Sequence, residues 1–174
     1  QLRTDAGATR LLHVSLNGLR HRLGGSVFAQ VHGELGDECP DLDKPARLVS
    51  FAAALCTLRD AGHVLAYHDV SDGGLFATLA EMAFAGHCGL DVNLPGKEGS
   101  AVEQLFAEEP GVVLQVRAAA LDALQVTWRL HGLEHCVREI GAPAVDMRVR
   151  IAVGEAALDI SWRELREAWS RTSY

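Results

Sequence analysis

The sequence predicts an α+β fold in which helices pack on a mixed β-sheet. Strand-like and helix-like segments are intermixed along the chain, and the segment 145–153 alternates apolar and polar residues. Intermixed elements favour a sheet covered by helices, and strict alternation is typical of a half-exposed strand at an antiparallel edge. The composition, 48% apolar and 22% charged, is that of a globular protein, and 174 residues are enough for one domain with a substantial core.

The strands are predicted from short apolar runs bounded by Gly, Pro or charged residues. In the segment 145–153, Val145, Met147 and Val149 begin an apolar face that continues to Val153. The expected strands are 11–16, 63–69, 88–95, 111–116, 135–141 and 145–153.

The helices are predicted from apolar spacing and from residues that start or stop a helix. Ser26 is a suitable N-cap for the first helix, and Gly62, Gly86 and Gly132 follow later helical patterns as stop signals. Pro110 disfavours continuation of the helix before it. The expected helices are 27–35, 47–60, 74–85, 100–109 and 119–131.

Charge, hydropathy and cysteine spacing argue against several functional classes. The net charge is −7 and no basic stripe is present, which argues against a nucleic-acid partner. The longest apolar run, residues 51–56, is far too short to span a bilayer, so no membrane partner is expected. The four cysteines are scattered without a CxxC pair, which favours free thiols in a cytoplasmic protein.

Both ends of the sequence suggest a module of a longer chain. Residue 1 is Gln rather than Met, and the final segment, SWRELREAWSRTSY, is helix-like without a stop signal after it. We therefore expect residues 1–174 to form a single module of a longer multidomain protein.

The segment AYHDVSDGGLFATLAEMAFAG, residues 66–86, places polar residues between a strand and an apolar helix. One interpretation is structural: Ser71 or Asp72 caps the helix, and the glycines supply the turn. The other is functional: Asp69 is a Mg²⁺ ligand, Ser71 contacts a nucleotide, and the backbone of residues 73–74 lines the approach of its phosphates. The segment matches neither GxxxxGK[ST] nor GxGxxG, so both interpretations stay open.

Other polar groups give weaker signals. The sequence GGS at 24–26 is either a second phosphate cradle or a plain N-cap turn. The acidic loop between residues 34 and 43 lacks EF-hand spacing, and His131, His135 and Cys136 lack a second pair of zinc ligands, so no metal site is expected at either. Within the helix 74–85, Thr78 and Glu81 face either a cleft or solvent.

Four blocks of the sequence resemble, in order, the long form of phosphoribosylformylglycinamidine synthase. The resemblance covers nearly the whole chain, and several long blocks in order are more specific than one motif. The blocks are RLGGSVFAQVHGELGDECPDLDKP, LAYHDVSDGGLFATLAEMAFAGHCGLDV, LFAEEPGVVLQV and LREAWSRTSY.

The resemblance implies a fold like the C-terminal domain of aminoimidazole ribonucleotide synthetase, and a match to the second such module of the synthase. It further implies a role in purine biosynthesis, in which ATP and glutamine are used to convert formylglycinamide ribonucleotide to its amidine. In the family's HDxSDGG block the first Asp is a Mg²⁺ ligand and the Ser contacts nucleotide, and these positions are Asp69 and Ser71 here. The implied cofactors are ATP or ADP and Mg²⁺.

The resemblance also implies partners that this sequence lacks. No glutaminase-type nucleophilic cysteine is present, and neither is the first synthase half. We therefore expect no catalytic residue in this chain, and an isolated module without activity, whose partners are the other domains of the same long chain.

Two alternatives remain beside the ligase module. One is a non-catalytic scaffold module that holds a structural nucleotide within an internal pseudo-dimer. The other is a sister enzyme, such as a selenophosphate or aminoimidazole synthetase, against which the blocks GHCGLDV and LGDECPD argue.

Overall fold

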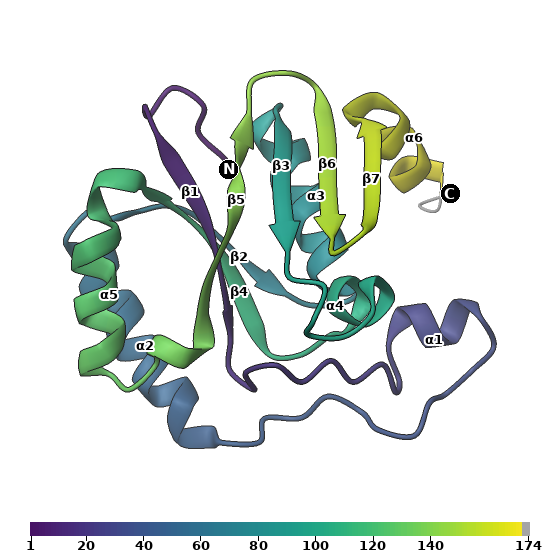
Figure 1. Ribbon diagram of the computed structural model, residues 1–174, viewed down its shortest axis with the longest axis horizontal. Coiled ribbons are helices and arrows are strands. Elements are labelled where there is room, and N and C mark those ends of the chain that lie inside the picture. The colour runs from purple at the N-terminus through teal and green to yellow at the C-terminus, as the bar shows by residue number, and fades with distance from the viewer. Residues whose placement is uncertain (172–174) are drawn as a thin grey trace.

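The computed structural model describes residues 1–171 and confirms the predicted class, a mixed sheet with packed helices. The seven strands lie in the order β2-β4-β1-β5-β3-β6-β7 (Figure 1). Among the strands of residues 1–171, only the β3–β6 pair is parallel, and all other neighbours are antiparallel. The strands are β1 (Thr9–Ser15), β2 (Val64–Val70), β3 (Gly89–Leu94), β4 (Gly111–Arg117), β5 (Val137–Ala144), β6 (Arg148–Val153) and β7 (Ala156–Ser161).

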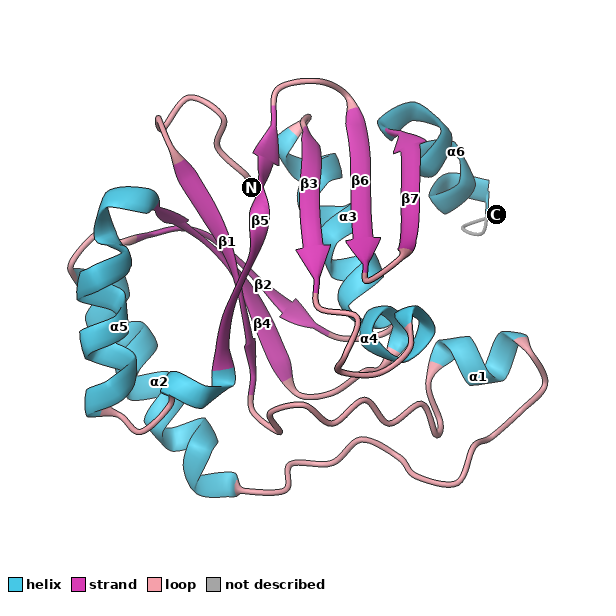
Figure 2. Cartoon of the chain, viewed as in Figure 1, coloured by secondary structure: helices cyan, strands magenta, loops and turns pink. Residues whose placement is uncertain are grey.

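The helices lie in two groups. Helices α2 and α5 pack against each other, while α3 contacts α4, α6 and β2 (Figure 2). The α-helices are α1 (Val27–Val31), α2 (Pro45–Asp60), α3 (Gly74–Gly86), α4 (Ala101–Phe106), α5 (Leu121–Leu130) and α6 (Trp162–Arg171), and two 3₁₀ turns are η1 (Ala118–Ala120) and η2 (Glu134–Cys136).

Each helix group covers its own apolar cluster on the sheet. Leu11 belongs to the cluster beneath α3, whereas the next residue, Leu12, belongs to the cluster beneath α2 and α5. Because successive side chains of a strand point to opposite faces, the sheet has helices on both faces. Residues of β4 alternate in the same way, with Val113 in the first cluster and Leu114 in the second.

The prediction for residues 145–153 was only partly right. Val149, Ile151 and Val153 are buried as expected, but Val145 and Met147 are 85% and 43% exposed and precede β6. The strand is not at the edge either, because it pairs in parallel with β3 and antiparallel with β7. The edge strand β7 was not predicted, since most of its residues are exposed and no apolar period marks it.

Two predicted helix ends were also wrong. The helix expected over 100–109 ends at Phe106, after which the backbone at Ala107 is extended. Gly86 is the last residue of α3 rather than its stop, and His87 takes the left-handed conformation (φ 47°) that ends the helix. A side chain at Gly86 would meet Leu2 at 2.8 Å, so this glycine permits close packing of the N-terminal segment.

Several local predictions are confirmed. Ser26 caps α1, although α1 is shorter than expected. Gly62 and Gly132 have φ of 71° and 68°, directly after the ends of α2 and α5. The helix-like tail is α6, whose description ends at Arg171; the rest of the matching tail block lies outside the described residues.

Two further findings concern membrane crossing and the cysteines. Within residues 1–171, no helix combines the length and apolar character that crossing a membrane requires. All four cysteines are free; Cys39 and Cys56 are exposed, and Cys88 and Cys136 are buried.

Candidate functional site

The segment 69–74 lies where the edge strand β2 ends and α3 begins. Asp69, Ser71 and Asp72 are all exposed there. Tyr67 and Asp69, two residues apart on β2, line the same side of a hollow of about 220 Å³, together with Leu48 and Phe51 of α2. The turn therefore presents two carboxylates and a hydroxyl beside an apolar hollow.

Asp69 is held by its neighbours. The Tyr67 hydroxyl donates a hydrogen bond to Oδ1 of Asp69. Burial, followed by this hydrogen bond, raises the pKa of Tyr67 above its ordinary value, so the phenol remains a donor at neutral pH. The Thr78 hydroxyl donates to the backbone carbonyl of Asp69 at 3.1 Å and to that of Gly74 at 3.0 Å. Oδ2 of Asp69 has no hydrogen-bond partner among residues 1–171.

The interpretation of Ser71 or Asp72 as the cap of α3 is wrong. The N-cap is Gly73, with φ 81°, and no side chain of the turn caps the helix. Within the described part of the chain, the side chains of Ser71 and Asp72 make no hydrogen bond. Instead, the N–H of Gly73 donates to Oε1 of Glu108 at 2.8 Å. The N–H of the N-cap residue is thus bound by a side chain 35 positions away in the sequence, while no side chain caps the first turn of α3.

Both glycines are required by the backbone of the turn. Gly73 and Gly74 have φ of 81° and 67°. A Cβ at Gly74 would lie 2.8 Å from the carbonyl oxygens of Leu105 and Ala107, so the end of α4 packs directly against this glycine. The N–H of Gly74 donates to the carbonyl of Ser71 at 2.9 Å. The N–H groups of both glycines are therefore engaged inside the protein rather than lining a phosphate approach.

The open question on Thr78 and Glu81 is settled by their contacts. Thr78 is 2% exposed, and its hydroxyl bonds to backbone carbonyls of the turn, as described above. Oε2 of Glu81 lies 3.1 Å from Nε2 of His68, whose Nδ1 lies 2.7 Å from the carbonyl oxygen of Asp69. Glu81 is accordingly a half-exposed partner of His68.

The second glycine turn, residues 24–26, is a capping turn. The N–H groups of Gly24 and Gly25 donate to the carbonyls of Glu38 (2.8 Å) and Leu35 (2.7 Å). The buried Ser26 hydroxyl donates to the carbonyl of Leu23 and accepts from the N–H of Ala29. With these donors already used, the structure gives no support to a phosphate cradle at this turn.

The other candidate clusters do not form metal sites. No group of three or more His, Cys, Asp or Glu side chains placed to hold a metal ion occurs within residues 1–171. In the acidic loop, Asp43 pairs with Arg20 and Arg22. Nε2 of His135 lies 2.9 Å from Arg47 rather than near a ligand set.

The donor set at the turn fits a partial Mg²⁺ site. Magnesium is commonly held by one or two carboxylates, with substrate phosphates and water supplying the other ligands. Asp69 offers one exposed carboxylate whose Oδ2 is without a partner in the described chain. One carboxylate, but not a complete cage, is therefore available here.

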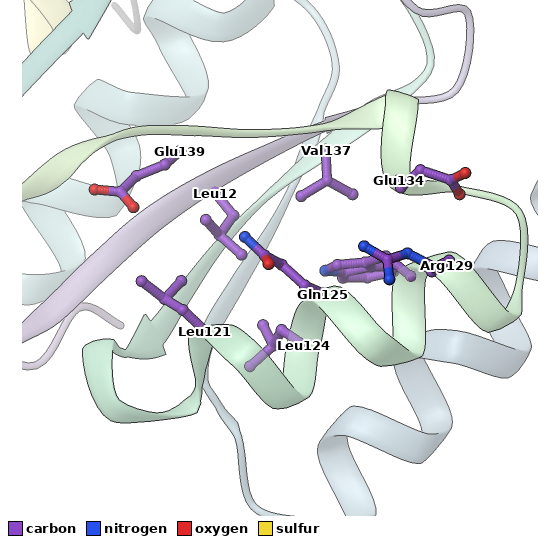
Figure 3. A pocket seen from close by; sticks show the side chains of 9 residues that line it. Leu12, Leu121, Leu124, Gln125, Arg129, Glu134, Val137 and Glu139 are labelled. Carbon is purple, nitrogen blue, oxygen red and sulfur yellow. The ribbon is translucent and has the colours of Figure 1, made fainter.

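A larger cavity, of about 330 Å³, lies away from these residues. It is formed by α5 together with β1 and β5, and none of these elements carries the turn. Figure 3 shows Leu121 and Leu124 of α5 below it and Glu139 and Val137 of β5 above it. Its apolar floor has a rim of exposed polar side chains, namely Gln125, Arg129, Glu134 and Glu139. None of the predicted site residues reaches this cavity.

Sequence reasoning missed Tyr67 and Glu108. Tyr67 appeared only as part of an apolar run, although its spacing of two from Asp69 on a strand would have placed both on one face. Glu108 was assigned to a helix that in fact ends at Phe106. Pro110 directly disfavours a helical backbone only at Glu109, so it is a weak signal for a helix that already ends at Phe106.

Comparisons with known proteins agree with this fold. The family model described as AIR synthase related protein, C-terminal domain, matches residues 10–151. The structure of T. maritima PurL complexed with FGAR is similar at a TM-score of 0.73 and 16% identity, over 91% of this chain and 28% of that one. T. maritima PurL complexed with ATP has a TM-score of 0.70 and 13% identity, over 91% and 25%.

A hydrogenase maturation protein, E. coli HypE, is similar at a TM-score of 0.58 and 22% identity, over 91% of this chain and 50% of that one. At these identities the solved structures show the fold alone. This chain corresponds to about a quarter of the length of the PurL chains. The family match, by contrast, covers most of the sequence. The chain therefore belongs to the family of AIR synthase related proteins, C-terminal domain.

Proposed function

We propose that the chain contributes a Mg²⁺–nucleotide site, with Asp69 as a metal ligand and Ser71 as a nucleotide contact. The observation that carries this proposal is the exposure of both side chains at one turn, with Oδ2 of Asp69 and the hydroxyl of Ser71 unpartnered within residues 1–171. Bound there, Mg²⁺ would neutralise phosphate charge. The apolar hollow beside Asp69 would accommodate an uncharged part of the nucleotide.

The wider role that we propose is that of a module in an ATP- and glutamine-dependent ligase of purine biosynthesis. In that role the module works in the cytoplasm with other domains of a longer chain, including a first synthase half and a glutaminase domain. Support comes from the resemblance of the sequence blocks and from the fold shared with PurL structures complexed with ATP, AMPPCP, ADP and FGAR.

Calorimetric titration of Mg-ADP into the 174-residue chain tests the site. Asp69→Asn removes a charge-assisted contact and is expected to cost about 1.5–3 kcal/mol, or about ten- to a hundredfold in affinity. Ser71→Ala removes a single neutral hydrogen bond and is expected to cost about 0.5–1.5 kcal/mol. Asp37→Asn, at an exposed loop position whose side chain makes no hydrogen bond or ion pair within residues 1–171, is the matched control and should bind like the wild type.

The same variants are melted without nucleotide. Because neither side chain caps α3, the apo melting temperatures should stay close to that of the wild type. Unchanged affinity in both variants, or no binding of Mg-ADP by the wild-type chain, would contradict the proposed site.

A further inference from the structure

The carboxylate of Glu108 joins two turns that are far apart in the sequence. Its Oε1 accepts the N–H of Gly73 at 2.8 Å and the N–H of Val27 at 2.9 Å. Gly73 is the N-cap of α3, and Val27 is the first residue of α1. Two helix starts, 46 residues apart by their numbers, therefore share one acceptor oxygen.

The contact of Glu108 with α3 is made at the N-cap residue, in a turn whose own side chains supply no cap. The first N–H groups of a helix need acceptors, and Ser, Thr, Asp or Asn at the N-cap usually supplies one. Here Gly73 has no side chain, while Ser71 and Asp72 point no acceptor at the helix. A carboxylate is also the favoured charge near a helix N-terminus. Glu108 therefore anchors the N-cap residue, and the hydroxyl of Ser71 makes no hydrogen bond within residues 1–171.

The segment that carries Glu108 is fixed on both sides. Before it, the carbonyls of Leu105 and Ala107 pack directly against Gly74. After it, the carboxylate of Glu109 is 6% exposed and accepts from Nε of Arg22 at 2.6 Å and from the side-chain amide of Asn17 at 2.6 Å. The backbone of Glu108 is therefore held in place, and its carboxylate has little freedom to leave the turn.

Backbone hydrogen bonds hold the turn on both sides of the two site residues. Glu108 holds the N–H of Gly73, and the next N–H, that of Gly74, holds the carbonyl of Ser71. On the inner side, the Thr78 hydroxyl holds the carbonyl of Asp69. The turn is thus fixed from outside by Glu108 and from inside by Thr78.

We propose that Glu108 is a positioning residue of the nucleotide site, which sets the orientation of Ser71 through Gly73. This inference rests on the function proposed above. In the proposed site, Glu108 contacts neither the metal nor the nucleotide. Its effect on binding passes through the backbone of the turn.

The test compares Mg-ADP affinities of Glu108→Ala and Glu108→Gln with the wild-type chain, at a temperature where all three are folded. Glu108→Ala is expected to weaken binding roughly tenfold, because the turn loses its charge-assisted anchor. Glu108→Gln keeps an acceptor oxygen and should weaken binding by about threefold. Glu155→Gln, which removes an exposed charge in the β6–β7 turn, should leave the affinity unchanged.

A double variant separates positioning from simple stabilisation. If Glu108 acts through the turn, Ser71→Ala should have little further effect on affinity in the Glu108→Ala background, since the hydroxyl is already misplaced. In the wild-type background, Ser71→Ala should weaken binding by about two- to tenfold. A merely structural role would lower the melting temperature and leave these affinities independent.

Three results would overturn the inference. The first is wild-type affinity in Glu108→Ala, which would leave the nucleotide site itself standing. The second is tighter binding in Glu108→Ala, which would mean that the carboxylate competes with phosphate. The third is the absence of Mg-ADP binding by the wild type, which would overturn the proposed function and with it any positioning role.

Discussion

The two glycine turns of this protein have similar sequences but different structures. In the first, residues 24–26, the serine side chain caps the following helix and both glycine N–H groups bond to the 35–38 loop. In the second, residues 71–74, the serine side chain makes no hydrogen bond in the described chain, no side chain caps the helix, and Glu108 binds the N–H of the N-cap residue Gly73. The serine of the second turn, unlike that of the first, is therefore not engaged by the helix that follows it and is available to a ligand.

The largest expected losses of stability come from replacing a glycine of each turn that packs directly against neighbouring backbone. Gly24→Ala would place a Cβ 2.3 Å from the carbonyl oxygen of Glu38, and Gly74→Ala would place one 2.8 Å from two carbonyl oxygens. Each substitution should reduce the free energy of unfolding by about 3–5 kcal/mol, since backbone atoms cannot yield cheaply. Urea denaturation measures the change.

Gly62→Ala is the matched control for Gly74→Ala. Gly62 has φ of 71°, close to that of Gly74, but a Cβ there meets nothing within 4 Å. The Gly62→Ala variant should lose only about 1 kcal/mol in the free energy of unfolding, from backbone strain alone. Equal losses at the two sites would show that close packing against α4 is unimportant.

A somewhat smaller effect is expected from Glu109→Gln. This change removes the closer of the two carboxylate partners of the Arg22 guanidinium, which lies four residues before Ser26, and leaves only the more exposed Asp43. We expect a loss of about 2–3 kcal/mol in the free energy of unfolding at neutral pH.

The same variant makes a prediction about pH. Burial by itself would raise the pKa of Glu109, but hydrogen bonds from Arg22 and Asn17 outweigh it and hold the pKa below its ordinary value of 4.5. The unfolded chain then binds the proton first as pH falls, so the stabilisation is present above about pH 4.5 and is lost below it. Between pH 5 and 3, wild-type stability should therefore fall more steeply than that of Glu109→Gln. Parallel curves would contradict this assignment.

Ser26→Ala should have a moderate effect. It removes a buried cap and its bond to the carbonyl of Leu23, and we expect a loss of about 1 kcal/mol in the free energy of unfolding. Thermal melting at two or more pH values checks that the loss does not come from titration of the neighbouring acidic loop.

Ser71→Ala should have the smallest effect on stability, within about 0.5 kcal/mol of the wild type, because its hydroxyl contributes no contact within residues 1–171. The serine variants therefore form a matched pair across the two turns. A loss at Ser71 equal to that at Ser26 would mean that both serines are caps, and the contrast between the turns would disappear.

Sequence alone predicted the parts of the structure that depend on local pattern. Apolar runs located six of the seven strands, and Ser26, Gly62 and Gly132 marked real helix boundaries. The edge strand β7 was missed because its residues stay exposed and show no period. Val145 and Met147 continued an alternating pattern beyond the point where the sheet supplies a partner.

The site was predictable as a set of residues but not as a set of contacts. The spacing of Asp69 and Ser71 near the glycines was visible in the sequence. The contacts of Glu108 span 35 and 81 residues, and no local rule connects such positions. The anchoring of the α3 N-cap residue by Glu108, and the absence of a capping role for Ser71, required the tertiary structure.

The most direct test of the Asp69–Ser71 site is to locate the bound metal. Mn²⁺ also favours carboxylate and phosphate oxygens, so Mn-ADP can replace Mg-ADP in a titration of the ¹⁵N-labelled chain. We predict that paramagnetic broadening is strongest at the amides of Val70, Ser71 and Asp72 and is lost in Asp69→Asn. Strongest broadening at the Gly24–Ser26 turn or beside the α5 cavity, or equal broadening in Asp69→Asn, would contradict the account.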